Sequence, residues 1–446
     1  MSTTETLVKN ILSTRYDDFP ETLIEHAKKS IMNWMGVAIG ASHHASVDMV
    51  LDLKKDLGGS DQVSVYGRSE KADIALASLI NGMTAHIFDY DDTHLDTIHH
   101  PSSPVAPVAF ALGEKLKLSG KEVLTAFILG CEAELRISNA VYPSHYDLGW
   151  HITSTTGSFG AAVAAGILLN LSEEQMKHAL GLAGTQASGL RDVFGTMTKP
   201  FHPGKAAHNG LISALLAKKG FTCSTRILEA KRGFANVLAP QHQLEKVNAD
   251  WKKVWELEKN SFKPYACGIV LHPVIDACIG LKEASGAGPD DVQEIEIHVN
   301  PYVLELTGIE EPKTGLAGKF SVYHTASIAF IDGDAGQDQY EDSKVLDPKT
   351  VAMHKKIKPV IKPSMREDEA YAKLVLKNGQ VFETYIEHAT GSRENPMTLE
   401  GLKRKFLNVT KHIISKDQAS ELIDVMMNIE KEVNLDNIVR MATLKN

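Results

Sequence analysis

The stretch Gly157-Ser-Phe-Gly-Ala-Ala-Val-Ala-Ala-Gly-Ile-Leu-Leu169 decides the fold class of this sequence. Alanine is the best helix former, and small Ala and Gly side chains let a helix lie close against its neighbours. The segment is much shorter than the roughly 20 apolar residues that span a bilayer. It therefore predicts a central helix inside a bundle.

Helical periodicity extends on both sides of this segment. Glu21 to Gly40 follows Pro20, a favourable position for a helix start, and Ser172-Glu-Glu-Gln175 is a capping box that begins another helix. The tail returns to helical spacing after a break. The sequence predicts a mainly α protein, whose large all-helical domain comprises residues 1–264 and is completed by residues 396–446.

The pattern changes between residues 265 and 395. Val292 to Val299 alternates apolar and polar residues, as a half-buried strand does, and Ala372 to Ile386 is typical of a hairpin turned at Asn378-Gly379. Lys356 to Pro363 contains two prolines and fits only an edge strand. We expect a smaller α+β domain here, which agrees with the two domains expected for a chain of 446 residues.

The charge balance restricts the class of partner. The net charge is −9, from 47 Lys and Arg against 56 Asp and Glu, and it opposes attraction to nucleic acid or an anionic membrane. The first residues form no continuous apolar segment, so we expect no secretory signal and a cytosolic protein. The four cysteines match no zinc or redox motif and are expected to be reduced thiols.

The densest chemical signal is His86-Ile-Phe-Asp-Tyr-Asp-Asp-Thr-His-Leu-Asp-Thr-Ile-His-His100, with four Asp and four His within fifteen residues. A carboxylate beside an imidazole sets the tautomer and basicity that acid/base catalysis requires. The alternatives are a solvated acidic loop and a metal site, but no ligand motif of fixed spacing supports a metal. We predict an acid/base site without a metal.

A second cluster supplies the positive charge that an anionic substrate needs. Within thirteen residues, Thr196 to His208 collects Lys199, His202, Lys205 and His208. Two prolines and Gly204 predict a rigid loop between helices, with a basic surface loop as the alternative. A charged lysine here would stabilise a developing enolate.

Other candidates are weaker when taken alone. His151 precedes the Ala-rich helix, where the helix dipole and free N–H groups favour a carboxylate. Beyond residue 260, plausible side chains are Cys267, His272, Tyr323 and His324. No nucleotide-binding motif occurs in the sequence, so no cofactor is expected.

Four segments, taken in order, resemble motifs of the MmgE/PrpD family. They are Asp-Tyr-Asp-Asp-Thr-His followed by His-Pro-Ser-Ser, Gly-Trp-His before Gly-x-Phe-Gly-Ala-Ala, Thr-Lys-Pro-Phe-His-Pro-Gly-Lys-Ala-Ala, and Lys-Pro-Tyr-Ala-Cys with a later Leu-His. The resemblance spans nearly the whole chain. It implies a helical domain with a smaller α+β lid domain, a homodimer, and a cofactor-free site between the domains.

The resemblance also implies roles for individual residues. Active-site positions fall on Asp89, Thr93, His100, His151 and Lys199. We expect His100, held by Asp89, and His151 to form the acid/base pair. The expected substrate-binding residues, beside Lys199, are Thr93, Lys205, His202, Cys267, His272, Tyr323 and His324. Cys267 and His324 differ from the decarboxylase branch, which has a histidine and a tyrosine at these places.

The chemistries of this family share the removal of a proton alpha to a carboxylate, with cations stabilising the intermediate. The expected substrate is a small di- or tricarboxylic acid. A hydro-lyase resembling 2-methylcitrate dehydratase is the first expectation. An epimerase of an aspartate-derived diacid such as iminodisuccinate, a cis-aconitate-type decarboxylase, a metal-dependent hydratase and a non-enzymatic scaffold are the alternatives.

Overall fold

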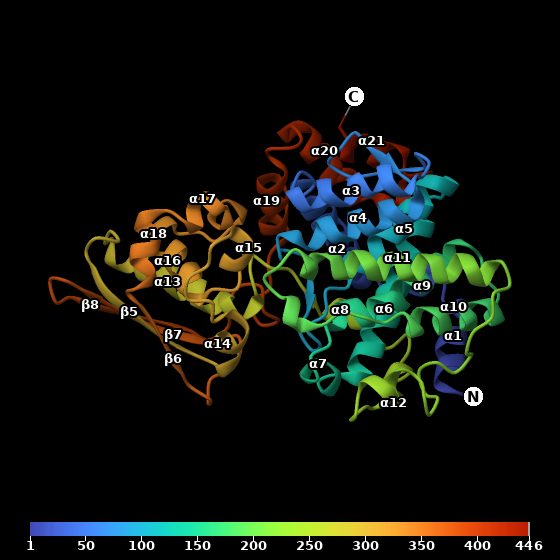
Figure 1. The fold of residues 1–446 in the computed structure, drawn as a ribbon, viewed down its shortest axis with the longest axis horizontal. Coiled ribbons are helices and arrows are strands. Elements are labelled where there is room, and N and C mark those ends of the chain that lie inside the picture. The colour runs from blue at the N-terminus through green and yellow to red at the C-terminus, as the bar shows by residue number, and fades with distance from the viewer. Residues whose placement is uncertain (445–446) are drawn as a thin grey trace.

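The chain forms two bodies joined side by side. A computed structural model describes residues 1–444. Figure 1 shows a large body of packed helices and a smaller body that holds a sheet, with both chain ends on the larger one. Helices dominate the element order and the sheets are small, which confirms the mainly α class. We call the two parts the helical body (α1 to α12 with α19 to α21) and the smaller body (α13 to β8).

The predicted central helix, α9 (Gly157–Leu168), lies inside the helical body. It packs against α6 (Gly120–Val141), α5 (Ser102–Leu116), α10 (Glu173–Thr185) and α11 (Thr198–Lys218). Small residues are required at these crossings. A Cβ on Gly210 of α11 would lie 2.4 Å from the Cβ of Ala161, and such close approach is open only to glycine.

The remaining helices of this body surround that centre. The longer ones are α1 (Thr3–Ser13), α2 (Glu21–Gly40), α3 (Ala45–Leu57) and α4 (Ile74–Ile87), and the short ones are α7 (Ser144–Asp147), α8 (Ile152–Thr155) and α12 (Phe234–Leu238). α2 begins directly after Pro20, and Ser172 caps α10 through the predicted capping box. Both local predictions are confirmed.

The proline-containing segment Thr196 to His208 was expected to be a loop, and this is wrong. α11 already begins at Thr198. Pro200 lies in the first turn, where the backbone N–H groups have no partner within the helix, so its missing N–H costs little. Gly204 allows α11 to touch α4, since a Cβ there would lie 2.2 Å from the carbonyl oxygen of Leu79. The cationic side chains therefore project from a packed helix.

Two short strand pairs lie in the helical body, one local and one between distant segments of the chain. β1 (Val63–Ser64) pairs with β2 (Lys71–Ala72), and β3 (Thr93–His94) pairs with β4 (Asn260–Ser261). The second pair matters for function. It brings the chain just before Lys263 against the Asp/His-rich segment.

The smaller body contains a four-stranded sheet in the order β6-β5-β7-β8. β5 (Val292–Val299) is central and parallel to the edge strand β6 (Ile357–Ile361), while β7 (Ala370–Leu376) and β8 (Val381–Ile386) form the hairpin. The predicted strand, edge strand and hairpin are all confirmed. Its helices are α13 (His272–Ser285), α14 (Pro301–Thr307), α15 (Gly315–Gly318), α16 (Val322–Asp332), α17 (Asp342–Val345) and α18 (Pro348–His354).

The C-terminal segment returns to the helical body, as its helical spacing indicated. It forms α19 (Leu399–Thr410), α20 (Lys416–Met426) and α21 (Asp436–Ala442), which Figure 1 shows beside α2 and α3. α19 packs on α2, where a Cβ on Gly40 would lie 2.4 Å from the carbonyl oxygen of Val409. The two ends of the chain are thus tied to one core.

An apolar cluster joins the two bodies. Ile80 and Met83 of α4 belong to the same buried cluster as Ala266, Val270 and Val274 at the start of the smaller body. This contact fixes the seam at which the candidate site lies.

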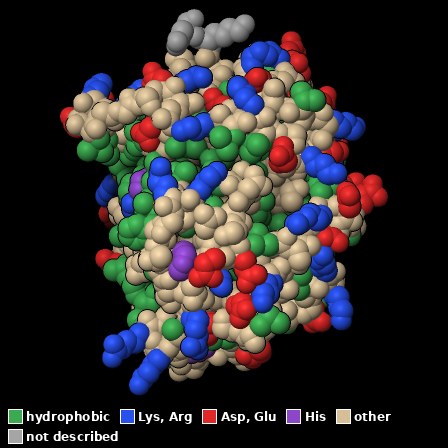
Figure 2. All heavy atoms as spheres, turned by 90° about the vertical axis from the view of Figure 1, so that its right-hand side faces the viewer, with side chains coloured by type: hydrophobic (Ala, Val, Ile, Leu, Met, Phe, Trp, Pro, Cys, Tyr) green, Lys and Arg blue, Asp and Glu red, His purple; other side chains and the backbone are tan. Residues whose placement is uncertain are grey.

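The surface mixes charges of both signs. On the face in Figure 2, basic and acidic side chains are interspersed, without a continuous basic area on that face. Within residues 1–444, no helix combines the length and the apolarity that crossing a membrane requires.

Candidate active site

A small cavity of about 60 Å³ lies at the seam between the two bodies. All five positions that the family motifs marked line it, namely Asp89, Thr93, His100, His151 and Lys199. The smaller body contributes Phe320, Thr307 and the backbone around Gly268. The cavity therefore collects residues from segments far apart in the sequence.

Asp89 is the hub of a buried ion cluster. It follows α4 with a φ of 50°, a left-handed conformation that Asp tolerates better than most residues. Its Oδ1 accepts hydrogen bonds of 2.8 Å from both Lys199 Nζ and Lys263 Nζ. Burial alone would raise the pKa of Asp89, but the two ammonium groups outweigh it and hold the pKa well below its usual range. The cluster carries one net positive charge.

Lys199 is also enclosed by aromatic rings. Its Nζ lies 5.2 Å from the ring centre of Phe194 and 5.1 Å from that of Phe320. An aromatic face attracts a cation electrostatically. Burial lowers the pKa of Lys199, and Asp89 opposes that shift. Since Phe194 belongs to the helical body and Phe320 to the smaller one, the seam is closed around this ammonium group.

The prediction that Asp89 holds His100 is wrong. The carboxylate that faces the His86 and His100 rings belongs to Asp91. Asp91 lies 2.8 Å from His86 Nδ1, whereas its Oδ1 is 3.6 Å from His100 Nδ1. The chain turns sharply at Asp89, so its carboxylate points toward the lysines and the carboxylate two residues later faces the imidazoles.

His100 is oriented by the backbone. Its Nδ1 lies 2.8 Å from the carbonyl oxygen of Asp92 and 3.1 Å from Thr93 Oγ1. A carbonyl oxygen can only accept, so Nδ1 carries the proton and Nε2 keeps a lone pair. Burial lowers the pKa of His100 to about 3. The ring is therefore neutral at pH 7, with an unprotonated nitrogen available as a base.

His151 forms a pair with His202. The two Nδ1 atoms are 2.9 Å apart, so one ring donates its proton to the other. Burial and the neighbouring His202 hold the pKa of His151 well below its usual range, and burial lowers the pKa of His202 to about 4. His151 lines the cavity and His202 lies behind it. When His202 donates, the proton of His151 stands on Nε2.

His86 completes the buried imidazole group, and sequence reasoning assigned it no role. Its ring centre is 4.7 Å from that of His100, and its Nε2 is buried with no hydrogen-bond partner among residues 1–444. One atom each from His86, Asp89 and His100 lie within 4.8 Å of one another, a spacing that a metal ion could bridge. Because two ammonium groups already occupy Asp89 Oδ1, a metal ion would have to compete with them.

The other predicted substrate-binding residues lie outside this cavity. Lys205, expected to bind a substrate carboxylate, lies on α11, 3.3 Å from His208 Nδ1. The second lysine at the cavity is Lys263, to which the sequence prediction assigned no role. Cys267 is fully buried, and its carbonyl oxygen accepts from Lys263 Nζ at 3.2 Å. Burial raises the pKa of its thiol to about 12.

Three more predicted residues belong to the smaller body. His272 is buried beside an adjoining cavity. His324 Nε2 lies 3.0 Å from the carbonyl oxygen of Gln339, and its ring faces His354. Tyr323 is half-buried and, like His324, does not line the catalytic cavity. Their predicted contact with a substrate stays a prediction.

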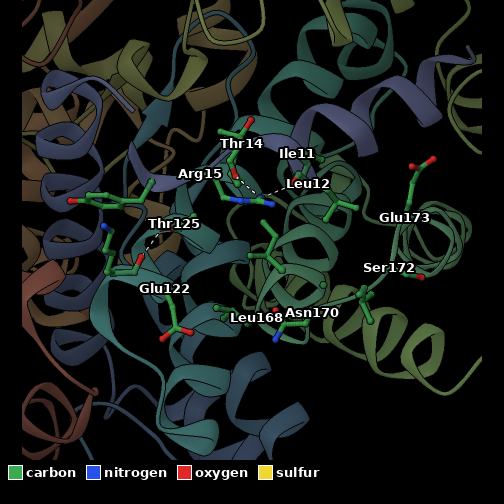
Figure 3. A pocket seen from close by; sticks show the side chains of 16 residues that line it. Ile11, Leu12, Thr14, Arg15, Glu122, Thr125, Leu168, Asn170, Ser172 and Glu173 are labelled. Carbon is green, nitrogen blue, oxygen red and sulfur yellow. Dashed lines mark hydrogen bonds between the residues drawn. The ribbon is translucent and has the colours of Figure 1, made fainter. Parts of the chain in front are cut away.

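A much larger hollow lies elsewhere in the helical body. It measures about 610 Å³ and is lined by α1, α6 and the segment between α9 and α10. Figure 3 shows the Arg15 side chain in this hollow, with its guanidinium bonded to the carbonyl oxygens of Leu12 and Thr14. Ser172 and Glu122, which also line it, belong to helix caps. The polar groups of this hollow thus serve helix ends.

Comparison with known proteins agrees with the sequence motifs. The chain is 26% identical over 447 residues to the cis-aconitate decarboxylase of Mus musculus, covering 96% of this chain and 91% of that protein. It is 25% identical to the cis-aconitate decarboxylases of Aspergillus terreus, over 95% of this chain and 92% of that protein, and of Homo sapiens, over 96% and 92%. The MmgE/PrpD N-terminal domain matches residues 5–247 and the MmgE/PrpD C-terminal domain matches residues 265–431. With both domains matched in order along the chain, this protein belongs to the MmgE/PrpD family.

Proposed function

We propose that this protein is a lyase that moves a proton at the carbon beside a carboxylate of a small di- or tricarboxylic acid. One observation carries the proposal. A net positive cluster of Lys199, Lys263 and Asp89 shares a buried cavity with His100 and His151, whose depressed pKa values leave both rings neutral. Perturbed titratable groups that converge in a cavity are the mark of acid/base catalysis.

The lysine cluster would bind the anion. A substrate carboxylate beside the two ammonium groups shares them with Asp89, and in a site closed to water this attraction is much stronger than at the surface. When a proton leaves the adjacent carbon, negative charge spreads onto that carboxylate. Lys199 and Lys263 then stabilise the enolate-like intermediate, because their charges are already in place.

The imidazoles would move the proton. His100 Nε2 takes the proton from carbon, and the proton on Nδ1 stays bonded to the carbonyl oxygen of Asp92. His151, with its proton on Nε2, gives a proton to a leaving hydroxyl or back to carbon. Its Nδ1 then receives the proton of His202, which regains one from solvent.

Decarboxylation and dehydration differ in the bond that breaks. The similarity to cis-aconitate decarboxylases along 95% or more of the chain favours decarboxylation. In that reaction, the carbon–carbon bond to a carboxylate breaks, carbon dioxide leaves, and the electron pair left on carbon takes a proton from an imidazole. The presence of two separate imidazoles, one positioned as a base and one as a donor, favours dehydration as a second candidate.

Product analysis tests the proposal. The purified chain is incubated with a panel of tricarboxylates (cis-aconitate, citrate and 2-methylcitrate) and dicarboxylates (malate and 2-butylmalate), and carbon dioxide release is followed together with the ultraviolet absorbance of carbon–carbon double bonds. Carbon dioxide release identifies the decarboxylase, and a change of absorbance without it identifies the hydro-lyase. If every acid in the panel is racemised or left unchanged, the lyase proposal is wrong.

A further inference from the structure

The catalytic cavity opens beside a second, larger cavity. The second cavity measures about 340 Å³ and shares five wall residues with the first, namely Thr93, Ile98, Ile269, Val270 and Glu367. We call it the antechamber. A substrate held at Lys199 that exceeds the room at the ion cluster would extend past these five residues into this space.

The catalytic cavity is small enough to set that limit. At roughly 10–15 Å³ for each water, its 60 Å³ holds about four to six waters. Covalently bonded atoms lie closer together than waters do, so this room fits the skeleton of a four-carbon dicarboxylate. Any further substituent on that skeleton must lie in the antechamber.

The antechamber has an excess of negative charge. Its acidic side chains are Asp96, Glu367, Asp368 and Glu394, and its two arginines are already paired. Arg393 Nη2 lies 2.6 Å from Asp96, and Arg366 Nε lies 3.1 Å from Asp368. His388 is also engaged, with its Nδ1 2.6 Å from Asp368. A third carboxylate would enter this space against repulsion, with no free cation to meet it among the described lining residues.

The inner wall of the antechamber is apolar. It consists of Leu95, Ile98, Ile269, Val270 and Ala389. His272 adds a buried ring, 1% exposed, whose two nitrogens have no hydrogen-bond partner within the described chain. Burial lowers the pKa of His272 to about 3, so the ring is neutral at pH 7. These groups suit an uncharged arm.

We infer that the substrate is a four-carbon dicarboxylic acid carrying an uncharged, largely apolar substituent, and that this substituent occupies the antechamber. The inference rests on the proposed function, because the dicarboxylate core is placed at Lys199 and Lys263. It narrows the substrate class away from tricarboxylates such as those that the similar decarboxylases act on.

Calorimetric titration of the full chain tests this with three ligands: succinate, 2-butylsuccinate and propane-1,2,3-tricarboxylate. Each buried methylene strengthens binding roughly threefold to fourfold, so 2-butylsuccinate should bind at least about tenfold more tightly than succinate. The tricarboxylate should bind no more tightly than succinate. Equal binding of succinate and 2-butylsuccinate, or tighter binding of the tricarboxylate, would overturn the inference.

Variants locate the arm and separate the two proposals. Leu95 lines the antechamber but not the catalytic cavity, so Leu95→Trp narrows only the antechamber. The variant should bind 2-butylsuccinate no more tightly than succinate, with succinate binding unchanged. Leu116→Trp, at an exposed position 44% accessible, is the matched control. If the Leu95→Trp variant still binds 2-butylsuccinate more tightly than succinate, the butyl arm lies elsewhere and the inference about the antechamber is wrong. If Leu95→Trp does not fold, the ligand series on the unaltered chain still decides.

Lys199→Met shows which proposal has failed. It should abolish binding of all three ligands. If succinate binds in a Lys199-dependent way but the butyl arm adds nothing, the inference about the arm fails and the proposed function stands. If binding of every ligand is independent of Lys199, the proposed site itself is wrong.

Discussion

The cavity at the seam and the hollow in Figure 3 differ in size and in the charge that they bury. The hollow is about ten times larger, at 610 Å³ against 60 Å³, yet its Arg15 and Glu122 serve helix ends near the surface. The small cavity buries Asp89, Lys199 and Lys263 together. Burying charges is costly unless they are paired, so a fold keeps such a cluster where chemistry needs it. Buried charge beside neutral imidazoles, and not size, makes the small cavity the candidate active site.

Removing the base should give the largest effect on activity. His100→Asn keeps a polar side chain of similar reach but has no basic nitrogen, and kcat/KM should fall by roughly 10²- to 10⁴-fold. Steady-state kinetics on the substrate found in the acid panel measures this. The control is His43→Asn, an exposed imidazole outside the cavity. Equal activity in the His100 variant and the control would remove His100 from the mechanism.

Removing one ammonium group should cost somewhat less. Lys199→Met leaves Lys263 paired with Asp89, so the protein should fold while kcat/KM falls by roughly 10²- to 10³-fold. Lys121→Met removes a cation from the hollow of Figure 3 and should change nothing. A comparable loss in both variants would mean that general folding, and not the ion cluster, is being measured.

The pH dependence should separate the buried imidazoles from ordinary ones. A base acts only while unprotonated, and burial lowers the pKa of His100 to about 3. Activity should therefore stay level as pH falls from 7 to about 5, where a histidine with the usual pKa near 6.5 would already be mostly protonated. On the alkaline side, burial lowers the pKa of Lys199, so activity should decline at a lower pH than the deprotonation of an ordinary lysine would cause. A midpoint near pH 6.5 in kcat/KM would show an exposed imidazole as the base.

The helix contact behind the cavity should affect stability. A Cβ on Gly204 would lie 2.2 Å from the carbonyl oxygen of Leu79, so Gly204→Ala should push α11 from α4 and destabilise the fold by about 1–3 kcal/mol. Gly288→Ala, whose Cβ would come no closer than 3.6 Å to another group, is the control. Denaturant unfolding of both variants measures the difference, and equal midpoints would contradict the tight crossing.

The smallest effect is expected in the large hollow. Arg15→Ala removes a side chain that contacts only its own helix end, so stability should change by less than about 0.5 kcal/mol and activity should stay the same. Thermal unfolding and the same kinetic assay check this. A marked loss of activity would give the hollow a function that its contacts do not indicate.

Much of the fold was predictable because it depends on local patterns. The start of α2 after Pro20, the capping box at Ser172 and the hairpin at Asn378-Gly379 each follow from a few neighbouring residues. The error at Thr196 to His208 has a local cause as well, because a proline such as Pro200 that indicates a loop is also compatible with the first turn of a helix. Pro203 lies further inside α11, where nothing in the sequence alone indicated a helix.

The site was predictable only as a set of residues. The five motif positions share one cavity, yet the partners of Asp89 lie 110 and 174 residues away in the sequence. Which lysine reaches a carboxylate is decided by the packing of α11 on α4 and by the pairing of β3 with β4. The Phe194 and Phe320 rings left no signal, since aromatic residues are common in any core.

Solvent deuterium incorporation tests the central claim most directly. The substrate found in the acid panel is turned over in deuterium oxide, and mass spectrometry and proton NMR locate deuterium in the recovered substrate and the product. We expect deuterium at the carbon beside the carboxylate. The His100→Asn variant should incorporate it at least about 100-fold more slowly than the unaltered protein. Absence of deuterium at that carbon in both the recovered substrate and the product, or incorporation at an unchanged rate in the variant, would contradict proton transfer by His100.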